Sequence, residues 1–116
     1  MDPTCKISQV VTGDRSRRLV IAGDVDLAAH DELCRTILAA IDSGVGHLVV
    51  DLRQVTFFDS GAVGVLVAGH NAARRAGCTY QVVDPPDLVR RVLRANGILQ
   101  LLVAGQDPAK AAGRPA

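Results

Sequence analysis

Hydrophobic and polar positions alternate at the start of the chain and then change to a different period. Residues 5–11 alternate loosely, the polar stretch 12–18 ("TGDRSRR") interrupts them, and an apolar run ("LVIAGDVD") begins at Leu19. Two β-type runs joined by a polar turn are typical of a hairpin. We therefore expect two antiparallel strands near the N-terminus.

A helical period replaces the alternation from Leu27 to Ser43. Apolar side chains recur there at three- and four-residue spacings, at Leu33, Ile37, Leu38 and Ile41. Asp26 stands where an N-cap is expected, and Gly44 stands where a helix should end. The pattern predicts a first helix.

Strands and helices continue to alternate beyond this helix. The nearly continuous apolar run "HLVVDL" (47–52) predicts a central strand buried on both faces. A second helix is expected over about 61–76, since two cations and then Gly77 mark its end. The segment "TYQVV" (79–83) predicts a fourth strand.

The C-terminal part completes an α/β pattern. Residues 84–97 predict a third helix opened by prolines, and "ILQLLVA" (98–104) predicts a last strand or edge segment. This order indicates a mixed sheet, with an N-terminal hairpin, parallel core strands and helices packed on it. We expect a single domain over 1–116, with its core at about 5–103 and a flexible or partly helical tail at 104–116.

Length, composition and charge exclude several classes of protein. A chain of 116 residues that is 48% hydrophobic and 22% charged fits one globular domain with an aliphatic core. Its aromatic share of 3% and its net charge of +1, without a basic tract, give no basis for nucleic-acid binding. No apolar run reaches the ~18 residues of a membrane span, and no leader pattern is present. We expect a cytoplasmic protein without direct membrane insertion.

Metal and disulfide chemistry are not indicated. Cys5, Cys34 and Cys78 are odd in number and lack C-x-x-C spacing, so we interpret them as reduced thiols, with a redox switch left open. Asp26, His30 and Cys34 share a helix face at a spacing that can suit a metal. His30 and Cys34 fall within the apolar stripe, so a satisfied histidine and a small core thiol explain them better.

The segment "FFDSGAVGVL" (57–66) interrupts an apolar run with Asp59 and Ser60. These two residues fall at the end of the third strand and the start of the second helix, where a side chain can cap exposed N–H groups. An ordinary N-cap role for Ser60 is one interpretation. A functional role is the other.

The outer face of the second helix is unusually small and uncharged. A helical wheel places Val63, Leu66, Val67 and His70 on the core side. It places Gly61, Gly64, Val65, Ala68 and Ala72 on the opposite side. Because glycine lowers helix propensity by ~1 kcal/mol relative to alanine, such a face suits close approach of a partner. Burial of both faces inside this chain is the alternative, and the exposure of Ala68 decides between them.

Long stretches resemble the STAS domain family, the fold of anti-sigma-factor antagonists. "LVVDLRQVTFFDSGAVGVLVAG" (48–69) is similar to the strand, loop and helix of that family. "VIAGDVDLAAHDELCRTI" (20–37) resembles its second strand and first helix. "DLVRRVLRANGILQLL" (87–102) resembles its C-terminal helix and following strand, so the resemblance covers roughly residues 5–103.

The resemblance implies partner switching controlled by a phosphorylated serine. Ser60, directly after Asp59, matches the phosphorylation site of the bacterial antagonists, although Gly61 and Ala62 replace the family's frequent second hydroxyl residue and glycine. The unmodified antagonist binds an anti-sigma factor that is also a serine kinase, and a serine phosphatase reverses the modification. A phosphate adds about −1.5 to −2 charge beside the outer helix face, so we expect a local electrostatic block with little backbone change.

Two further acidic residues match family positions near this loop. Asp24 and Asp26 lie at the end of the second strand and are assigned to the partner-facing surface, although Asp26 can also act simply as a helix cap. The full predicted partner-binding set is Asp24, Asp26, Asp59, Ser60, Gly61, Gly64, Val65 and Ala68.

Enzymatic activity is not expected. Phe58 replaces the first glycine of a G-x-S-x-G elbow, and His70 lies roughly 15 Å from Ser60 along the same helix, too far for proton transfer. Neither a dinucleotide fingerprint nor a phosphate-binding loop is present, so no cofactor is implied.

These observations predict an anti-sigma-factor antagonist, a phosphoprotein that regulates sigma-factor-dependent transcription in a stress response. Two alternatives are an accessory STAS subunit of a membrane transport assembly that works without phosphorylation, and a STAS signalling scaffold.

Overall fold

A β-hairpin begins the fold in the computed structural model, which describes residues 5–99 and 101–102. Strands β1 (Cys5–Gly13) and β2 (Ser16–Val25) pair antiparallel, with Cys5 opposite Gly23. Asp14 and Arg15, in the middle of the polar segment 12–18, form the turn. The hairpin predicted from the N-terminal alternation is confirmed.

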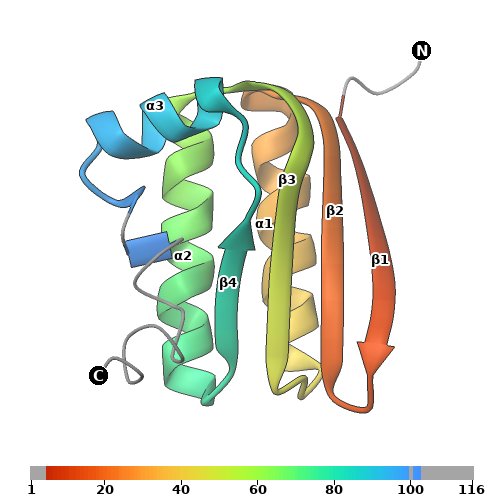
Figure 1. Ribbon diagram of the computed structural model, residues 1–116. Helices are drawn as coiled ribbons and strands as arrows, with labels where there is room; N and C mark the ends of the chain where they lie inside the picture. The colour runs from red at the N-terminus through yellow and green to blue at the C-terminus, as the bar shows by residue number, and fades with distance from the viewer. Residues whose placement is uncertain (1–4, 100, 103–116) are drawn as a thin grey trace.

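Two strand–helix–strand crossovers follow the hairpin. Helix α1 (Leu27–Asp42) connects β2 to β3 (His47–Phe58), and α2 (Ser60–Ala76) connects β3 to β4 (Thr79–Val83). Strands β2, β3 and β4 are parallel, and the sheet order is β1-β2-β3-β4. Figure 1 shows α1 and α2 side by side on one face of this sheet. The predicted mixed α/β sheet is confirmed.

The core lies between this sheet face and the two helices. Its largest fully buried side chains come from all of these elements and include Leu19, Ile21, Leu33, Ile37, Leu48, Leu52 and Leu66. The Tyr80 hydroxyl donates a hydrogen bond to the Leu66 carbonyl at 3.0 Å. A Cβ added at Gly69 would lie 2.7 Å from that hydroxyl and 2.7 Å from Ile37 Cγ2. Gly69 therefore allows α2 to pack closely on β4 and α1.

Helix ends follow the predicted signals. Helix α2 ends at Gly77, which has φ 72° in the left-handed region, after Arg74 and Arg75 in the last turn. Helix α3 (Asp87–Ala95) begins after Pro86, as the proline signal predicted. In Figure 1, α3 lies beside the first turns of α2.

Residues 98–104 were predicted as a last strand or an edge segment, and the strand is wrong over the part that the structure describes. Leu101 and Leu102 lie in a helical turn, and the Leu102 N–H donates to the Ile98 carbonyl at 3.1 Å. A short apolar run is compatible with either a buried helical turn or a strand, and here Leu102 is fully buried at 0% exposure. Residues 103 and 104 and the predicted tail lie outside the described residues.

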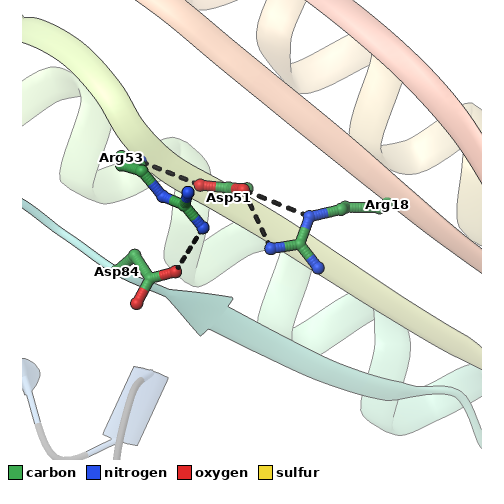
Figure 2. A network of polar contacts seen from close by, with 4 residues as sticks. All are labelled: Arg18, Asp51, Arg53 and Asp84. Atoms are coloured by element: carbon green, nitrogen blue, oxygen red, sulfur yellow. Dashed lines mark hydrogen bonds and ion pairs between the residues drawn. The ribbon is translucent and has the colours of Figure 1, made fainter.

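A polar network lies within the predicted apolar strand "HLVVDL". Asp51 is buried, its Oδ2 accepts from Arg18 Nε and Nη2 at 3.1 and 2.9 Å, and its Oδ1 accepts from the Arg53 N–H at 2.9 Å. Arg53 Nη2 donates to Asp84 Oδ2 at 3.1 Å, in the loop between β4 and α3 (Figure 2). Burial alone would raise the pKa of Asp51, but these donors outweigh burial and lower it. The network ties β2, β3 and the β4–α3 loop together.

Candidate functional site

The junction of β3 and α2 presents Ser60 while its neighbour caps the helix. Asp59 occupies the N-cap position, with extended backbone, and its side chain accepts from the Ala62 N–H at 2.9 Å. Ser60 is the first helical residue and is exposed. The interpretation of Ser60 as the N-cap is therefore wrong, because Asp59 accepts the N–H that a capping side chain would accept. The Ser60 side chain faces solvent at the end of the parallel strands.

A histidine from α1 holds the capping carboxylate. His30 Nε2 lies 2.7 Å from Asp59 Oδ1, and the exposed fractions of the two side chains are 16% and 33%. Burial alone would raise the pKa of Asp59, but the Ala62 N–H and His30 outweigh it and lower the pKa. His30 is thus a satisfied histidine, as predicted, and its partner lies in the Ser60 loop. Among the described residues, no His, Cys, Asp and Glu side chains gather in a group that could hold a metal ion.

The same histidine explains the glycine after Ser60. A Cβ at Gly61 would overlap the His30 ring, with His30 Nδ1 only 2.9 Å away. Any side chain at this position therefore requires His30 to move. Gly61 and His30 form a sterically matched pair, which gives a physical reason for the departure from the family's frequent hydroxyl residue.

The outer face of α2 is exposed at its centre. Gly61, Gly64 and Ala68 are exposed, and we call these three residues the small-residue face. A Cβ at Gly64 would meet no atom within 4 Å, so nothing in the described structure requires glycine there. Ala68 is exposed, so among the described residues no element buries the outer face of α2.

The helical wheel placed too few residues of α2 on the core side. Val65 and Ala72, which it placed on the outer face, are half-buried and pack against the core. The buried stripe of α2 consists of Ala62, Val63, Leu66, Gly69 and Ala73. Because α2 contacts both the sheet and α1, its buried arc is wider than contact with one neighbour requires. Val67 and His70, predicted on the core side, are half-buried.

Two acidic residues at the end of β2 lie at the same edge as Ser60, Asp24 within the strand and Asp26 directly after it. Asp24 pairs with Phe57 across the parallel strands, and its Oδ1 accepts from the Thr56 hydroxyl at 2.6 Å. Asp26 occupies the N-cap position of α1, but its side chain makes no capping hydrogen bond and its Oδ1 is buried without a hydrogen-bond partner. The interpretation of Asp26 as a simple cap is therefore wrong.

Comparison with known families identifies the fold. The sequence model of the family described as "Mlab, STAS domain" matches residues 8–113. The chain belongs to the STAS domain family. No helix in the described part of this STAS domain is long and apolar enough to cross a membrane.

Solved structures share the fold of this STAS domain at low sequence identity. An anti-sigma factor antagonist from Mycobacterium paratuberculosis is 22% identical with a TM-score of 0.76, covering 95% of this chain and 94% of that chain. The anti-sigma factor antagonist SpoIIAA in its unphosphorylated form is 16% identical with a TM-score of 0.75, covering 93% and 97%. The Bacillus cell fate determinant SpoIIAA in its phosphorylated form is 17% identical with a TM-score of 0.69, covering 84% and 88%.

Proposed function

We propose that this STAS domain is a non-enzymatic, cytoplasmic anti-sigma-factor antagonist that binds an anti-sigma serine kinase. Phosphorylation of Ser60 ends the complex, and a serine phosphatase restores it. The chain thereby regulates transcription that depends on a sigma factor. The proposal is supported by the family resemblance and by antagonist structures of the same fold, one of which is described in phosphorylated and unphosphorylated forms.

The division of roles between Asp59 and Ser60 is the observation that carries the proposal. Asp59 provides the helix cap, so the exposed Ser60 side chain is not required for capping. Ser60 borders the small-residue face, where Gly64 has no internal packing reason to be glycine. An exposed hydroxyl at the border of the small-residue face is well placed to control whether a partner packs there.

Electrostatics support a local switch at this position. A phosphate on Ser60 adds about −1.5 to −2 charge. The N-terminus of α2 favours that charge, whereas the neighbouring Asp59 carboxylate opposes it. The phosphorylated domain therefore stays folded, while a partner packed on α2 would have to desolvate the phosphate.

The proposed contact surface extends from the acidic edge along α2. It consists of Asp24, Asp26, Asp59, Ser60, Gly61, Gly64, Val65 and Ala68, with Val65 half-buried beneath its exposed neighbours. All of these residues come from the ends of β2 and β3 or from the first three turns of α2. A single partner surface can therefore contact them together.

Affinity capture from native cell extract tests the proposal. The baits are the wild-type chain, Ser60→Ala, Ser60→Asp and the control Ser8→Asp, which adds the same charge at an exposed serine of β1. We expect an anti-sigma serine kinase on every bait except Ser60→Asp. Equal retention of one partner by all four baits would contradict phosphorylation control.

That contrary result would favour a constitutive accessory subunit of a membrane transport assembly, the second candidate function. Its supporting observation is the family model, whose description names Mlab rather than an anti-sigma factor antagonist. The same α2 surface would then hold an ATPase subunit without a phosphorylation cycle.

A further inference from the structure

His30 uses one ring nitrogen to hold Asp59 and leaves the other without a hydrogen bond. Its Nε2 lies 2.7 Å from Asp59 Oδ1, and the same oxygen accepts from the Ala62 N–H at 2.9 Å. Among the described residues, Nδ1 has no hydrogen-bond partner. An ionised carboxylate only accepts hydrogen bonds, so Nε2 is the donor, and in the neutral ring Nδ1 is an acceptor. His30 can therefore bind a second proton at Nδ1 and keep its contact with Asp59.

The ring of His30 faces the backbone directly after Ser60. A Cβ at Gly61 would lie 2.9 Å from His30 Nδ1 and 3.1 Å from Nε2. Standard bond lengths and the spacing of successive Cα atoms then place a phosphate on Ser60 within roughly 10 Å of the imidazole. This distance is about one Debye length in physiological salt, and the His30 side chain is only 16% exposed. Salt therefore does not fully screen the two charges from each other.

The charged residues of α1 near His30 are acidic. Asp26 lies one turn before His30, and Asp31 and Glu32 follow it directly and are exposed. The titratable group one turn after His30 is the Cys34 thiol.

The two elements on which α1 packs, α2 and β2, also present carboxylates near His30. These are Asp59 at the start of α2 and Asp24 near the end of β2. The arginines of these elements lie at the far ends: Arg74 and Arg75 in α2, and Arg17 and Arg18 in β2. A phosphate at Ser60 would therefore add to negative charge that α2 and β2 do not balance locally.

The cations closer to this end of the molecule do not titrate near neutral pH. They include residues of β1 and α3, namely Lys6, Arg90, Arg91 and Arg94. Helix α3 lies beside the first turns of α2 (Figure 1). On α1, Arg35 points about 140° away from His30 around the helix. Because lysine and arginine ordinarily stay charged below about pH 9, their attraction for a phosphate is constant between about pH 5 and pH 8.

We propose that phosphorylation of Ser60 is coupled to the uptake of a proton at His30 Nδ1. The γ-phosphoryl group of the kinase's ATP bonds to Ser60 Oγ, its bond to ADP breaks, and the hydroxyl proton leaves to solvent. A proton from solvent binds Nδ1, and the imidazolium offsets the charge that the phosphate adds beside Asp59. By linkage, protonation of His30 favours the phosphorylated state. This inference rests on the proposed function, which supplies the modification.

An NMR titration of the purified chain with phosphoserine incorporated at residue 60 tests the coupling without a kinase. Phosphoserine titrates at about pH 6, in the range of imidazole, so the two groups should shift each other in opposite directions. We expect the midpoint of the His30 Cε1–H signal to rise by about half a pH unit or more relative to the unmodified chain, which is about threefold in proton affinity. His47 and His70 are internal controls, since they lie at the start of β3 and in the third turn of α2.

Two further chains identify the source of the shift. Phosphoserine at residue 8, an exposed position of β1, should leave the His30 midpoint unchanged. His30→Gln keeps an N–H donor for Asp59 but cannot bind the proton. In the chain with phosphoserine at residue 60, this substitution should raise the midpoint of the phosphorus NMR signal by a few tenths of a pH unit, because the phosphate loses a neighbouring cation.

An unchanged His30 midpoint with phosphoserine at residue 60 would overturn the coupling and leave the proposed function intact. An equal shift at His47 and His70, or with phosphoserine at residue 8, would also overturn it, because the shift would then reflect net charge and not proximity. An unchanged phosphorus midpoint in His30→Gln would overturn it from the side of the phosphate. Failure to capture any serine kinase from cell extract would instead overturn the proposed function, while the titration still decides the coupling.

Discussion

The imidazole of His30 lies 2.7 Å from the carboxylate of Asp59 and fills the space that a side chain at residue 61 would need. Helix α1 thereby fixes the loop that presents Ser60. This relationship joins residues 29 positions apart in the sequence. This one contact explains why residue 30 is histidine, residue 59 is aspartate and residue 61 is glycine.

Steric matching between His30 and Gly61 predicts a non-additive pair of substitutions. Gly61→Ala should lower the free energy of unfolding by about 1–3 kcal/mol, because the new methyl group overlaps the imidazole. In a His30→Ala background the same substitution should cost at least about 1 kcal/mol less. Urea unfolding of the four chains measures this coupling. Additive effects would show that the ring does not restrict residue 61.

The cap assignment predicts different effects for two adjacent residues. Asp59→Ala should lower the free energy of unfolding by about 1–2 kcal/mol, since it removes the acceptor for the Ala62 N–H and the partner of His30. Ser60→Ala should change it by less than about 0.5 kcal/mol. Thermal and urea unfolding of both variants provide the comparison. The reverse ranking would mean that Ser60 is the structural cap.

Two glycines of α2 should respond in opposite directions to alanine. Gly64→Ala should stabilise the fold by about 0.5–1 kcal/mol, because the added methyl group meets no atom and helix propensity improves. Gly69→Ala should destabilise it by about 1–3 kcal/mol through overlap with Ile37 and Tyr80. Each substitution is the control for the other in urea unfolding.

The exposed glycine also has a predicted cost in binding. Gly64→Ala should weaken the complex with the partner while it stabilises the free domain, since the methyl group lies on the proposed contact surface. Unchanged affinity together with increased stability would argue against close backbone approach at this position.

The buried carboxylate of Asp51 predicts a dependence of stability on pH. Its pKa is lower in the folded chain than the value of about 3.9 for an unfolded aspartate. The stability that it contributes is therefore present above pH 4 and is lost as the pH falls through the folded pKa. Asp51→Asn should lower the free energy of unfolding by about 2 kcal/mol at pH 7, less than for fully buried pairs because Arg18 is about one-third exposed.

Urea unfolding of the wild-type and Asp51→Asn chains at pH 7 and near pH 3 measures the loss of unfolding free energy. This loss should be smaller at the lower pH. Asp84→Asn is the control, because its pair with Arg53 is exposed at both ends and should contribute less than about 0.5 kcal/mol. An equal loss for Asp51→Asn at both values of pH would exclude an ionic contribution.

Local signals in the sequence were sufficient for most of the fold. The polar turn predicted the hairpin, Gly77 predicted the end of α2, and the β-branched run 79–83 predicted β4, because each depends on residues adjacent in the chain. The segment 98–104 could not be assigned, since a short apolar run has no period that distinguishes helix from strand.

The site required tertiary information. The family resemblance placed Asp24 near Asp59 and Ser60, and in the structure Asp24 pairs with Phe57, two residues before Asp59. The pairing of His30 with Asp59 depends on how α1 packs against α2, which the helical period of α1 does not determine. The exposure of Phe57 could have been predicted, because strand alternation turns it away from its buried neighbour Phe58.

The most direct test of the account is the affinity of purified chain, with and without phosphoserine incorporated at residue 60, for the anti-sigma serine kinase. A chain with phosphoserine at residue 8 is the control for added charge. We predict that phosphorylation at Ser60 raises Kd by about 100-fold or more, while the NMR spectrum changes only near the start of α2 and the control binds like the unmodified chain. Equal affinity of the Ser60-phosphorylated and unmodified chains would contradict the switch.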